Sequence, residues 1–253
     1  MTPLFAIITA TYNAGATLKR TLESIDGQTF TDYEHIIVDG ASTDNTLEIA
    51  EAHRSGRRTV VSEPDKGLYD AMNKGMGLSK GRYLIFINAG DKFHSHDTLR
   101  IIADAIAANG DPGIVYGQTD IVDNDGHYIG PRHLTAPDKL TLRSFAGGML
   151  VCHQAFIAVR NIVGFYNTSY RFSADYVWCI RCLQHSRKNI GLGVTVIIDY
   201  LNEGMTTRNH RSSLLARFRI MSFYYGLIPT IARHFGFAAR ALKRRTAKNR
   251  KGQ

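Results

Sequence analysis

Apolar runs and helical stripes alternate along the first hundred residues. The apolar runs are short and rich in β-branched and aromatic side chains, which is typical of strands buried on both faces. They lie at residues 5–10, 35–38, 59–62 and 83–87. Between them the apolar positions recur at helical spacing, over residues 16–25, 45–53 and 68–78. This alternation predicts a mainly parallel sheet with right-handed crossovers.

The second half of the chain has a less regular pattern. Its expected elements are a helix ending at Ala108, a strand at residues 113–122, a helix that follows Ser173 and runs to Leu183, and a strand at 194–201. Asp123 to Gly126 reads as a hairpin turn, and Ser173 as the N-cap of its helix. Residues 134–148 show no clear period, and we expect a mobile segment there. The predicted fold class is therefore α/β, with one main domain and an appendage.

Charge divides the chain into two unequal parts. The net charge is +9, yet Met205 to Gln253 contains twelve Lys and Arg and no acid, so the first 204 residues are slightly acidic. Three cysteines fit a reducing compartment better than a disulfide framework. The apolar run at residues 4–10 is too short for a secretory signal and no basic segment precedes it. We therefore expect a cytoplasmic location.

Polar residues follow the predicted strands at their carboxyl ends, the edge where open α/β sheets bind ligands. Thr11 and Asn13 follow the first strand, and small polar groups and free amides there can face a base or a phosphate. Asp39 ends the second strand and could pair with the N–H of a nucleotide base or cap the next helix, whereas capping is the better account for Asp44. Asp91 follows the fourth strand and could hold a hard divalent cation beside substrate phosphates.

Two stretches carry a family resemblance. Glu63 to Gly75 (EPDKGLYDAMNKG) resembles the core of the inverting, nucleotide-sugar-dependent glycosyltransferases of family two, in particular the colanic-acid-type exopolysaccharide subgroup. Asn88 to Asp91 (NAGD) occupies the place of that family's Asp-x-Asp-Asp turn, with Asn88 and Gly90 in place of two acids. The resemblance implies a GT-A fold and Asp91 as the remaining charged ligand for Mn²⁺ or Mg²⁺.

The resemblance also implies roles for individual residues. Asp175 would be the catalytic base, and an acid in the first turn of a helix is held ionised by the helix dipole. A merely helix-stabilising Asp gives the same pattern. Substrate-binding roles fall to Thr11, Asn13, Asp39, Asp70, Asn88, His153, Gln154, Gly204, Thr206 and Arg208. His153 and Gln154 lie in an apolar run, where a satisfied core pair is equally expected.

These observations together favour an inverting glycosyltransferase. It would move a sugar from a nucleotide-diphosphate sugar to a hydroxyl of a lipid-linked saccharide in polysaccharide biosynthesis. Residues 1–210 would form the GT-A domain, with a nucleotide-sugar half (1–100) and an acceptor half (101–210), and residues 211–253 a basic helical tail. A non-catalytic nucleotide-sugar-binding subunit is the alternative, because the acidic turn is reduced. A sugar-phosphate nucleotidyltransferase lacks support, since no Gly-rich basic loop follows the first strand.

The tail predicts attachment to a membrane surface. One apolar stripe runs from Leu214 to Ile228 and is ended by Pro229, and a second runs from Ile231 to Leu242 among basic residues. Arg219 and Arg233 interrupt the apolar sequence of the tail and leave no stretch long enough for a transmembrane span. Basic amphipathic helices bind anionic leaflets, so we expect a peripheral position on the inner face of the cell membrane. Nucleic acid is not an expected partner, because the part of the chain before the tail contains no recognisable nucleic-acid-binding motif.

Overall fold

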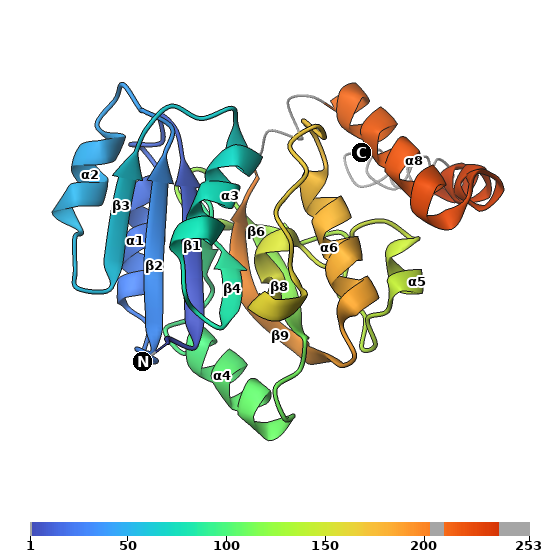
Figure 1. The fold of residues 1–253 in the computed structure, drawn as a ribbon, viewed down its shortest axis with the longest axis horizontal. Helices are drawn as coiled ribbons and strands as arrows, with labels where there is room; N and C mark the ends of the chain where they lie inside the picture. The colour runs from blue at the N-terminus through green and yellow to red at the C-terminus, as the bar shows by residue number, and fades with distance from the viewer. Residues whose placement is uncertain (1, 203–209, 238–253) are drawn as a thin grey trace, which may run out of the picture.

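The computed structural model describes residues 2–202 and 210–237 of the chain. Within them one sheet of nine strands runs in the order β3-β2-β1-β4-β8-β6-β9-β5, with β7 paired to β6 (Figure 1). The strands are β1 (Phe5–Thr11), β2 (Tyr33–Asp39), β3 (Arg58–Ser62), β4 (Tyr83–Phe86), β5 (Lys92–Phe93), β6 (Ile114–Val122), β7 (Tyr128–Pro131), β8 (Phe156–Val159) and β9 (Asn189–Leu201).

The two halves of the sheet differ in strand direction. β1 pairs in parallel with both β2 and β4, and β2 with β3, which confirms the parallel sheet predicted for the first hundred residues. Beyond β4 the sheet is mixed, because β8 runs antiparallel to both β4 and β6 while β9 is parallel to β6. The order of the first four strands places all their carboxyl ends at one edge, at the top of Figure 1.

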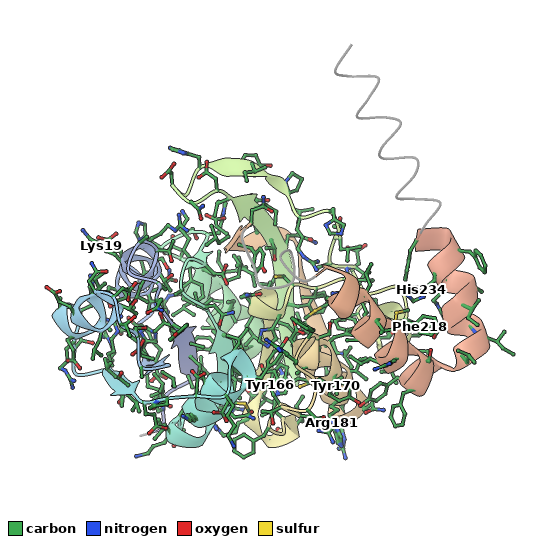
Figure 2. All side chains as sticks on the ribbon, turned by 90° about the horizontal axis from the view of Figure 1, so that it is seen from above. Lys19, Tyr166, Tyr170, Arg181, Phe218 and His234 are labelled. Carbon is green, nitrogen blue, oxygen red and sulfur yellow. The ribbon has the colours of Figure 1, made fainter. Side chains whose placement is uncertain are left out.

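Helices cover both faces of the parallel half. The helices are α1 (Leu18–Asp26), α2 (Thr46–Ala52), α3 (Leu68–Leu78), α4 (Thr98–Ala108), α5 (Leu142–Phe145), α6 (Ala174–His185) and α8 (His210–Tyr225), with 3₁₀ turns η1 (His153–Ala155) and η2 (Arg160–Ile162). Figures 1 and 2 show α3 on one face of the parallel strands and α1 on the other. Every side chain of β4 is buried, as expected for a strand covered on both sides.

Two details depart from the expectations. Residues 134–148 pack against the body: Leu140 and Phe145 are buried, and the Tyr116 hydroxyl donates hydrogen bonds to the carbonyls of Pro137 and Asp138. This stretch contains α5, whose single turn is too short to produce a readable period. Ser173 precedes α6 as predicted, but it takes a left-handed conformation (φ 66°) and its side chain makes no capping bond.

The described part of the tail contains two helices, as predicted, but they are separated at Gly226 and not at Pro229. α8 ends at Tyr225, Gly226 has φ 87°, and residues 227–237 are again helical. Pro229 lies in the first turn of that second helix, where its missing N–H has no helical partner to lose. Ile220 and Met221 are buried in the main core, so α8 packs on the body. No described helix has the length and apolar character needed to cross a membrane.

Candidate active site

The predicted site residues gather where the parallel strands end. Thr11 pairs with Asp39 across β1 and β2, and Asp39 pairs with Ser62 across β2 and β3. Asn88 and Asp91 follow β4 at the same edge. This arrangement is the direct consequence of parallel pairing, because strands in register bring the residues that follow them together.

Asp39 is fully buried, and its carboxylate holds two loops in place. Oδ2 accepts hydrogen bonds from the Ser42 N–H (3.0 Å) and the Ser62 hydroxyl (2.7 Å), while Oδ1 accepts one from the Ser42 hydroxyl. A carboxylate has about four lone-pair sites, so one remains for a nucleotide base. The base contact implied by the resemblance stays a prediction.

The turn after β1 is tied to the loop after β2. The Asn13 side-chain oxygen accepts the Thr43 N–H (2.9 Å), and the Asn13 N–H donates to the Ser42 hydroxyl (2.8 Å). Asp44 accepts the N–H of Thr46 at the start of α2, as expected for a capping residue. The Thr11 hydroxyl differs from these groups, since it is buried and has no hydrogen-bond partner among the residues that the structure describes. Buried polar groups normally have partners, so this hydroxyl is a candidate ligand contact.

Asp91 is a buried connector between three segments. Its Oδ2 accepts the Gln154 side-chain N–H (2.8 Å) from η1, and its Oδ1 accepts the Leu201 N–H (2.9 Å) from β9. Burial raises the pKa of Asp91 to about 7, against the opposing effect of these two hydrogen bonds. Gly90 before it has φ 100°, and a Cβ there would meet Cδ2 of Leu201 at 2.5 Å. An acid at residue 90 would therefore be strained and crowded in this turn.

The donor set at residues 88–91 consists of oxygen atoms only. Within residues 2–202 and 210–237, Asn88 Oδ1 is buried without a partner, and each Asp91 oxygen accepts one hydrogen bond and keeps a lone pair. Oxygen ligands of this kind suit Mg²⁺ or Mn²⁺ when substrate phosphates complete the coordination. The residues present thus fit a divalent cation held mainly by the substrate.

Asp175 occupies the first turn of α6 and is half-buried. Its Oδ1 accepts the Tyr69 hydroxyl (3.0 Å) and the Tyr176 N–H (2.9 Å). Tyr69 lies on α3, in the parallel half of the fold, and this hydrogen bond joins residues 106 positions apart. The start of α6 is thereby fixed against the same helix that carries the motif of residues 63–75.

His153 and Gln154 are core residues that support the site. His153 Nε2 lies 2.5 Å from the Tyr166 hydroxyl, and its ring packs on Phe86 at 4.9 Å. Burial lowers the pKa of His153 to about 4, so the ring is neutral near pH 7. Gln154 holds Asp91, as described above. The structure thus places the pair among satisfied partners, one of the two alternatives left open by the sequence, and direct substrate contact stays a prediction.

The remaining predicted residues fall into two groups. Asp70 accepts the Lys66 N–H (3.0 Å) and lies 3.9 Å from the Lys74 ammonium, so its carboxylate stabilises the start of α3. A substrate contact for Asp70 therefore stays a prediction. Gly204, Thr206 and Arg208 lie outside the described residues.

Sequence patterns missed the aromatic residues that surround Asp175. Tyr69 lies inside the quoted motif, and Tyr166 stacks on it with ring centroids 5.5 Å apart. Asn73, on the next turn of α3, exchanges two hydrogen bonds with the main chain of Tyr166. Helical spacing on α3 could have indicated that Tyr69 and Asn73 share a face, since they are four residues apart.

Other polar clusters lie away from these residues. His94, Asp120 and Asp199 come within reach of one another, but Asp199 is already paired with Lys92 (3.0 Å) and His94 (2.6 Å). A cleft of about 980 Å³ lies at the opposite, amino-terminal edge of the parallel strands and contains none of the predicted site residues. We place the chemistry at the carboxyl edge because the aligned polar groups are there.

Comparison with known proteins gives a consistent result. Residues 6–163 match the sequence model described as Glycosyl transferase family 2. A glycosyltransferase of Mycobacterium bovis named for PGL/p-HBAD biosynthesis is 36% identical over 189 residues, 72% of this chain and 71% of that protein.

Two solved structures resemble the fold. TarS 1-349 of S. aureus, in complex with UDP-GlcNAc, has a TM-score of 0.74 at 18% identity, covering 94% of this chain and 73% of that one. A mannosyltransferase of Pyrobaculum calidifontis, in complex with GDP-Man and Mn²⁺, has a TM-score of 0.62 at 18% identity, covering 98% and 80%. Likeness at these identities concerns the fold, and it confirms the predicted GT-A architecture.

Proposed function

This chain belongs to glycosyl transferase family 2, and we propose that it is an inverting enzyme that transfers a sugar from a nucleotide-diphosphate sugar to a saccharide hydroxyl. The observation that carries the proposal is the environment of Asp175. This carboxylate is half-buried at the start of α6 and hydrogen-bonded through Oδ1 to Tyr69 of the donor half. A carboxylate so held is suited to remove a proton from an acceptor hydroxyl.

The proposed reaction is a single displacement. The acceptor oxygen attacks the anomeric carbon as Asp175 takes its proton, and the bond from that carbon to the diphosphate breaks on the opposite side. Asp175 lies at the N-terminus of α6, where the positive end of the helix dipole favours negative charge. Alignment of hydroxyl, anomeric carbon and leaving group supplies a large part of such an acceleration.

The donor is proposed to bind at the carboxyl ends of β1, β2 and β4. Thr11, Asn13 and Asp39 would contact the nucleotide, and the unpartnered Thr11 hydroxyl supports this placement. Asn88 and Asp91 would hold Mn²⁺ or Mg²⁺, which when bound neutralises charge on the diphosphate.

Three further residues follow β9 in the sequence and are proposed to act on the same diphosphate. Gly204 and Thr206 would approach it through the main chain and a hydroxyl, and Arg208 would add positive charge. Donor sugars in the solved relatives, UDP-GlcNAc and GDP-Man, make both uridine and guanosine nucleotides reasonable candidates for this chain.

The acceptor is proposed to be lipid-linked, in an exopolysaccharide pathway at the inner face of the cell membrane. Exposed apolar side chains on the two tail helices support membrane attachment: Phe223 is 78% exposed, Ile228 81% and Phe235 73%. From Met205 onward the chain has basic residues and no acid, which suits an anionic leaflet.

Point variants test this attachment better than a truncation at Thr230. Thr230 is fully buried, and His234 packs on Phe218 of α8 at 5.0 Å (Figure 2), so removing the second helix would uncover the first. Changing Phe223, Ile228 and Phe235 to Ser should abolish sedimentation with anionic vesicles. The matched control changes three exposed side chains of the body to Ser: Tyr128, Ile129 and Val194. Equal sedimentation of both variants would reject attachment through the tail.

A non-catalytic nucleotide-sugar-binding subunit is the second candidate. The observation that favours it is the turn at residues 88–91, where Asn88 and Gly90 leave Asp91 as the one carboxylate. Such a subunit would bind a nucleotide sugar but form no product.

A screen of nucleotide sugars separates the two candidates. UDP-, GDP- and dTDP-sugars are incubated with lipid-linked saccharide acceptors, with and without Mn²⁺, and product is detected by mass spectrometry. The enzyme should form a glycoside of inverted anomeric configuration from one donor class. Tight donor binding without product under all conditions would favour the binding subunit, and a product of retained configuration would reject the proposed displacement.

A further inference from the structure

Aromatic stacking connects α3 to the start of α6. The Tyr69 ring on α3 stacks on Tyr166 with ring centroids 5.5 Å apart and planes inclined by 28°. Tyr166 in turn stacks on Trp178 of α6 at 5.4 Å and 20°. Figure 2 shows Tyr166 beside α3 and α6. The three rings form a continuous stack that fixes the spacing between the two helices.

The middle ring of this stack is itself held from two sides. Asn73 Nδ2 donates to the Tyr166 carbonyl (3.0 Å), and the Tyr166 N–H donates to Asn73 Oδ1 (2.7 Å). The Tyr166 hydroxyl lies 2.5 Å from His153 Nε2. Because both the main chain and the hydroxyl of Tyr166 are hydrogen-bonded, its ring has little rotational freedom. Tyr69 therefore stacks on a fixed surface.

The two oxygens of Asp175 are in different situations. Oδ1 accepts both the Tyr69 hydroxyl (3.0 Å) and the Tyr176 N–H (2.9 Å). Within residues 2–202 and 210–237, no hydrogen bond reaches Oδ2. Burial and then the charge of Asp175 raise the pKa of Tyr69 well above its usual value of 10.0, so the phenol remains a donor at working pH.

We propose that Tyr69 is a positioning residue for the proton-transfer step: it fixes Asp175 through Oδ1 and so leaves Oδ2 as the oxygen that takes the acceptor proton. This inference rests on the proposed function. The proton leaves the acceptor hydroxyl for Oδ2, the acceptor oxygen forms its bond to the anomeric carbon, and the electron pair of the breaking bond leaves with the diphosphate. Tyr69 keeps its own proton throughout.

The test is Tyr69→Phe, which keeps the stacked ring and removes only the hydroxyl. Loss of a hydrogen bond to a charged group should lower kcat about 10- to 100-fold, with little change in the donor KM. The acid limb of the kcat/KM profile should also move to higher pH, because a carboxylate that loses a donor holds its proton more tightly. A purely structural role would move neither the acid limb nor the ratio of kcat to KM in this way.

Tyr83→Phe is the matched control. It removes a buried hydroxyl that donates to the Pro112 carbonyl (2.8 Å), at the other end of the parallel strands. Both variants should show similar losses in thermal stability and unchanged donor binding by calorimetry, which establishes that both are folded. Kinetics and pH profiles of Tyr69→Phe that equal those of Tyr83→Phe would overturn the positioning role.

Asp175→Asn, measured in parallel, separates this inference from the proposed function. If Asp175→Asn abolishes transfer but Tyr69→Phe behaves like the Tyr83 control, only the positioning role of Tyr69 is rejected. If Asp175→Asn keeps wild-type transfer, the proposed base is wrong and the inference fails with it.

Discussion

The turn after β4 and the start of α6 each present one carboxylate, and the two are held in opposite ways. Asp91 is 3% exposed and accepts a hydrogen bond on each oxygen. Asp175 is half-buried, and the two hydrogen bonds that it accepts within the described residues both reach Oδ1. Asp91 therefore connects three segments of the scaffold, whereas in our proposal Asp175 keeps Oδ2 for the acceptor hydroxyl.

This difference shows how one kind of side chain can perform two tasks in one protein. Burial raises the pKa of Asp91 to about 7. Asp91 is also the hydrogen-bond acceptor for the Leu201 N–H and for the Gln154 side-chain amide. Replacing it should therefore damage structure and cation binding together. Asp175 is held by one phenol and by the N–H of the next residue, so replacing it should damage chemistry and leave the fold intact.

The largest effect is expected for Asp175→Asn. Asn keeps the shape and can still accept the Tyr69 hydrogen bond, but it cannot take the acceptor proton. Transfer should fall by about two to four orders of magnitude while donor binding persists. Steady-state kinetics and calorimetry with the same nucleotide sugar measure the two quantities, and retained turnover would place the base elsewhere.

Asp91→Ala should be the most damaging change for stability among these variants. It leaves the Leu201 N–H and the Gln154 amide buried without their acceptor, which costs about 3 kcal/mol of unfolding free energy. It should also abolish stimulation by Mn²⁺ and weaken binding of the diphosphate.

Asp91→Asn separates these two roles. The Asn oxygen can accept the Leu201 N–H, so stability should fall less, while the charge that attracts a cation is gone. Denaturant unfolding and a Mn²⁺ titration are measured on both variants. An unchanged Mn²⁺ titration in Asp91→Asn would limit Asp91 to its structural role.

His153 differs from the two carboxylates, because it is a base that is buried in its uncharged form. Its pKa is lowered from 6.5 to about 4, so the folded protein binds fewer protons than the unfolded chain between these values. The stability contributed by neutral His153 is fully present above pH 6.5 and is lost as the pH falls toward 4. The loss should reach up to about 3 kcal/mol.

Comparing wild type with His153→Phe isolates the contribution of His153 to the pH dependence of stability, because the contributions of His35 and Asp91 are present in both proteins. Phe keeps the aromatic contact with Phe86 and cannot be protonated. The variant should be less stable near neutral pH, having lost the Tyr166 contact, and the deficit should shrink on acidification. If the difference in stability between the two proteins stays constant over this pH range, His153 binds a proton as readily in the folded protein as in the unfolded chain.

Sequence patterns predicted the parallel half of the fold well, for a physical reason. Its strands are buried on both faces and its helices are amphipathic, so each element carries its own periodic signal, and parallel register then brings Thr11, Asp39 and Asp91 to one edge. In the mixed half the longer strands β6 and β9 were also predicted in part, but β5 has two residues and β8 has four, and neither was predicted.

The environments of the site residues could not be read in the same way. The hydrogen bond from Tyr69 to Asp175 joins distant positions, and the lowered pKa of His153 results from its burial in the folded chain. Contacts of this kind are set by tertiary packing. Local sequence therefore located the carboxylates, while the difference between the hydrogen bonds of Asp91 and those of Asp175 emerged only from the fold.

The smallest effect is expected at Thr11. Strand β1 carries one buried hydroxyl with a hydrogen-bond partner and one without, so the two can be compared directly. The Thr11 hydroxyl is buried and has no partner in the described part of the chain, whereas the Thr9 hydroxyl, two residues earlier on β1, lies 2.9 Å from His35 Nε2. Thr11→Val should leave the unfolding free energy unchanged or slightly higher, since a buried unpaired hydroxyl is removed, yet weaken donor binding about tenfold. Thr9→Val should do the reverse, costing about 1 kcal/mol of stability with unchanged donor affinity. Calorimetric titration and denaturant unfolding of both variants give the four numbers, and unchanged donor affinity in Thr11→Val would remove Thr11 from the nucleotide site.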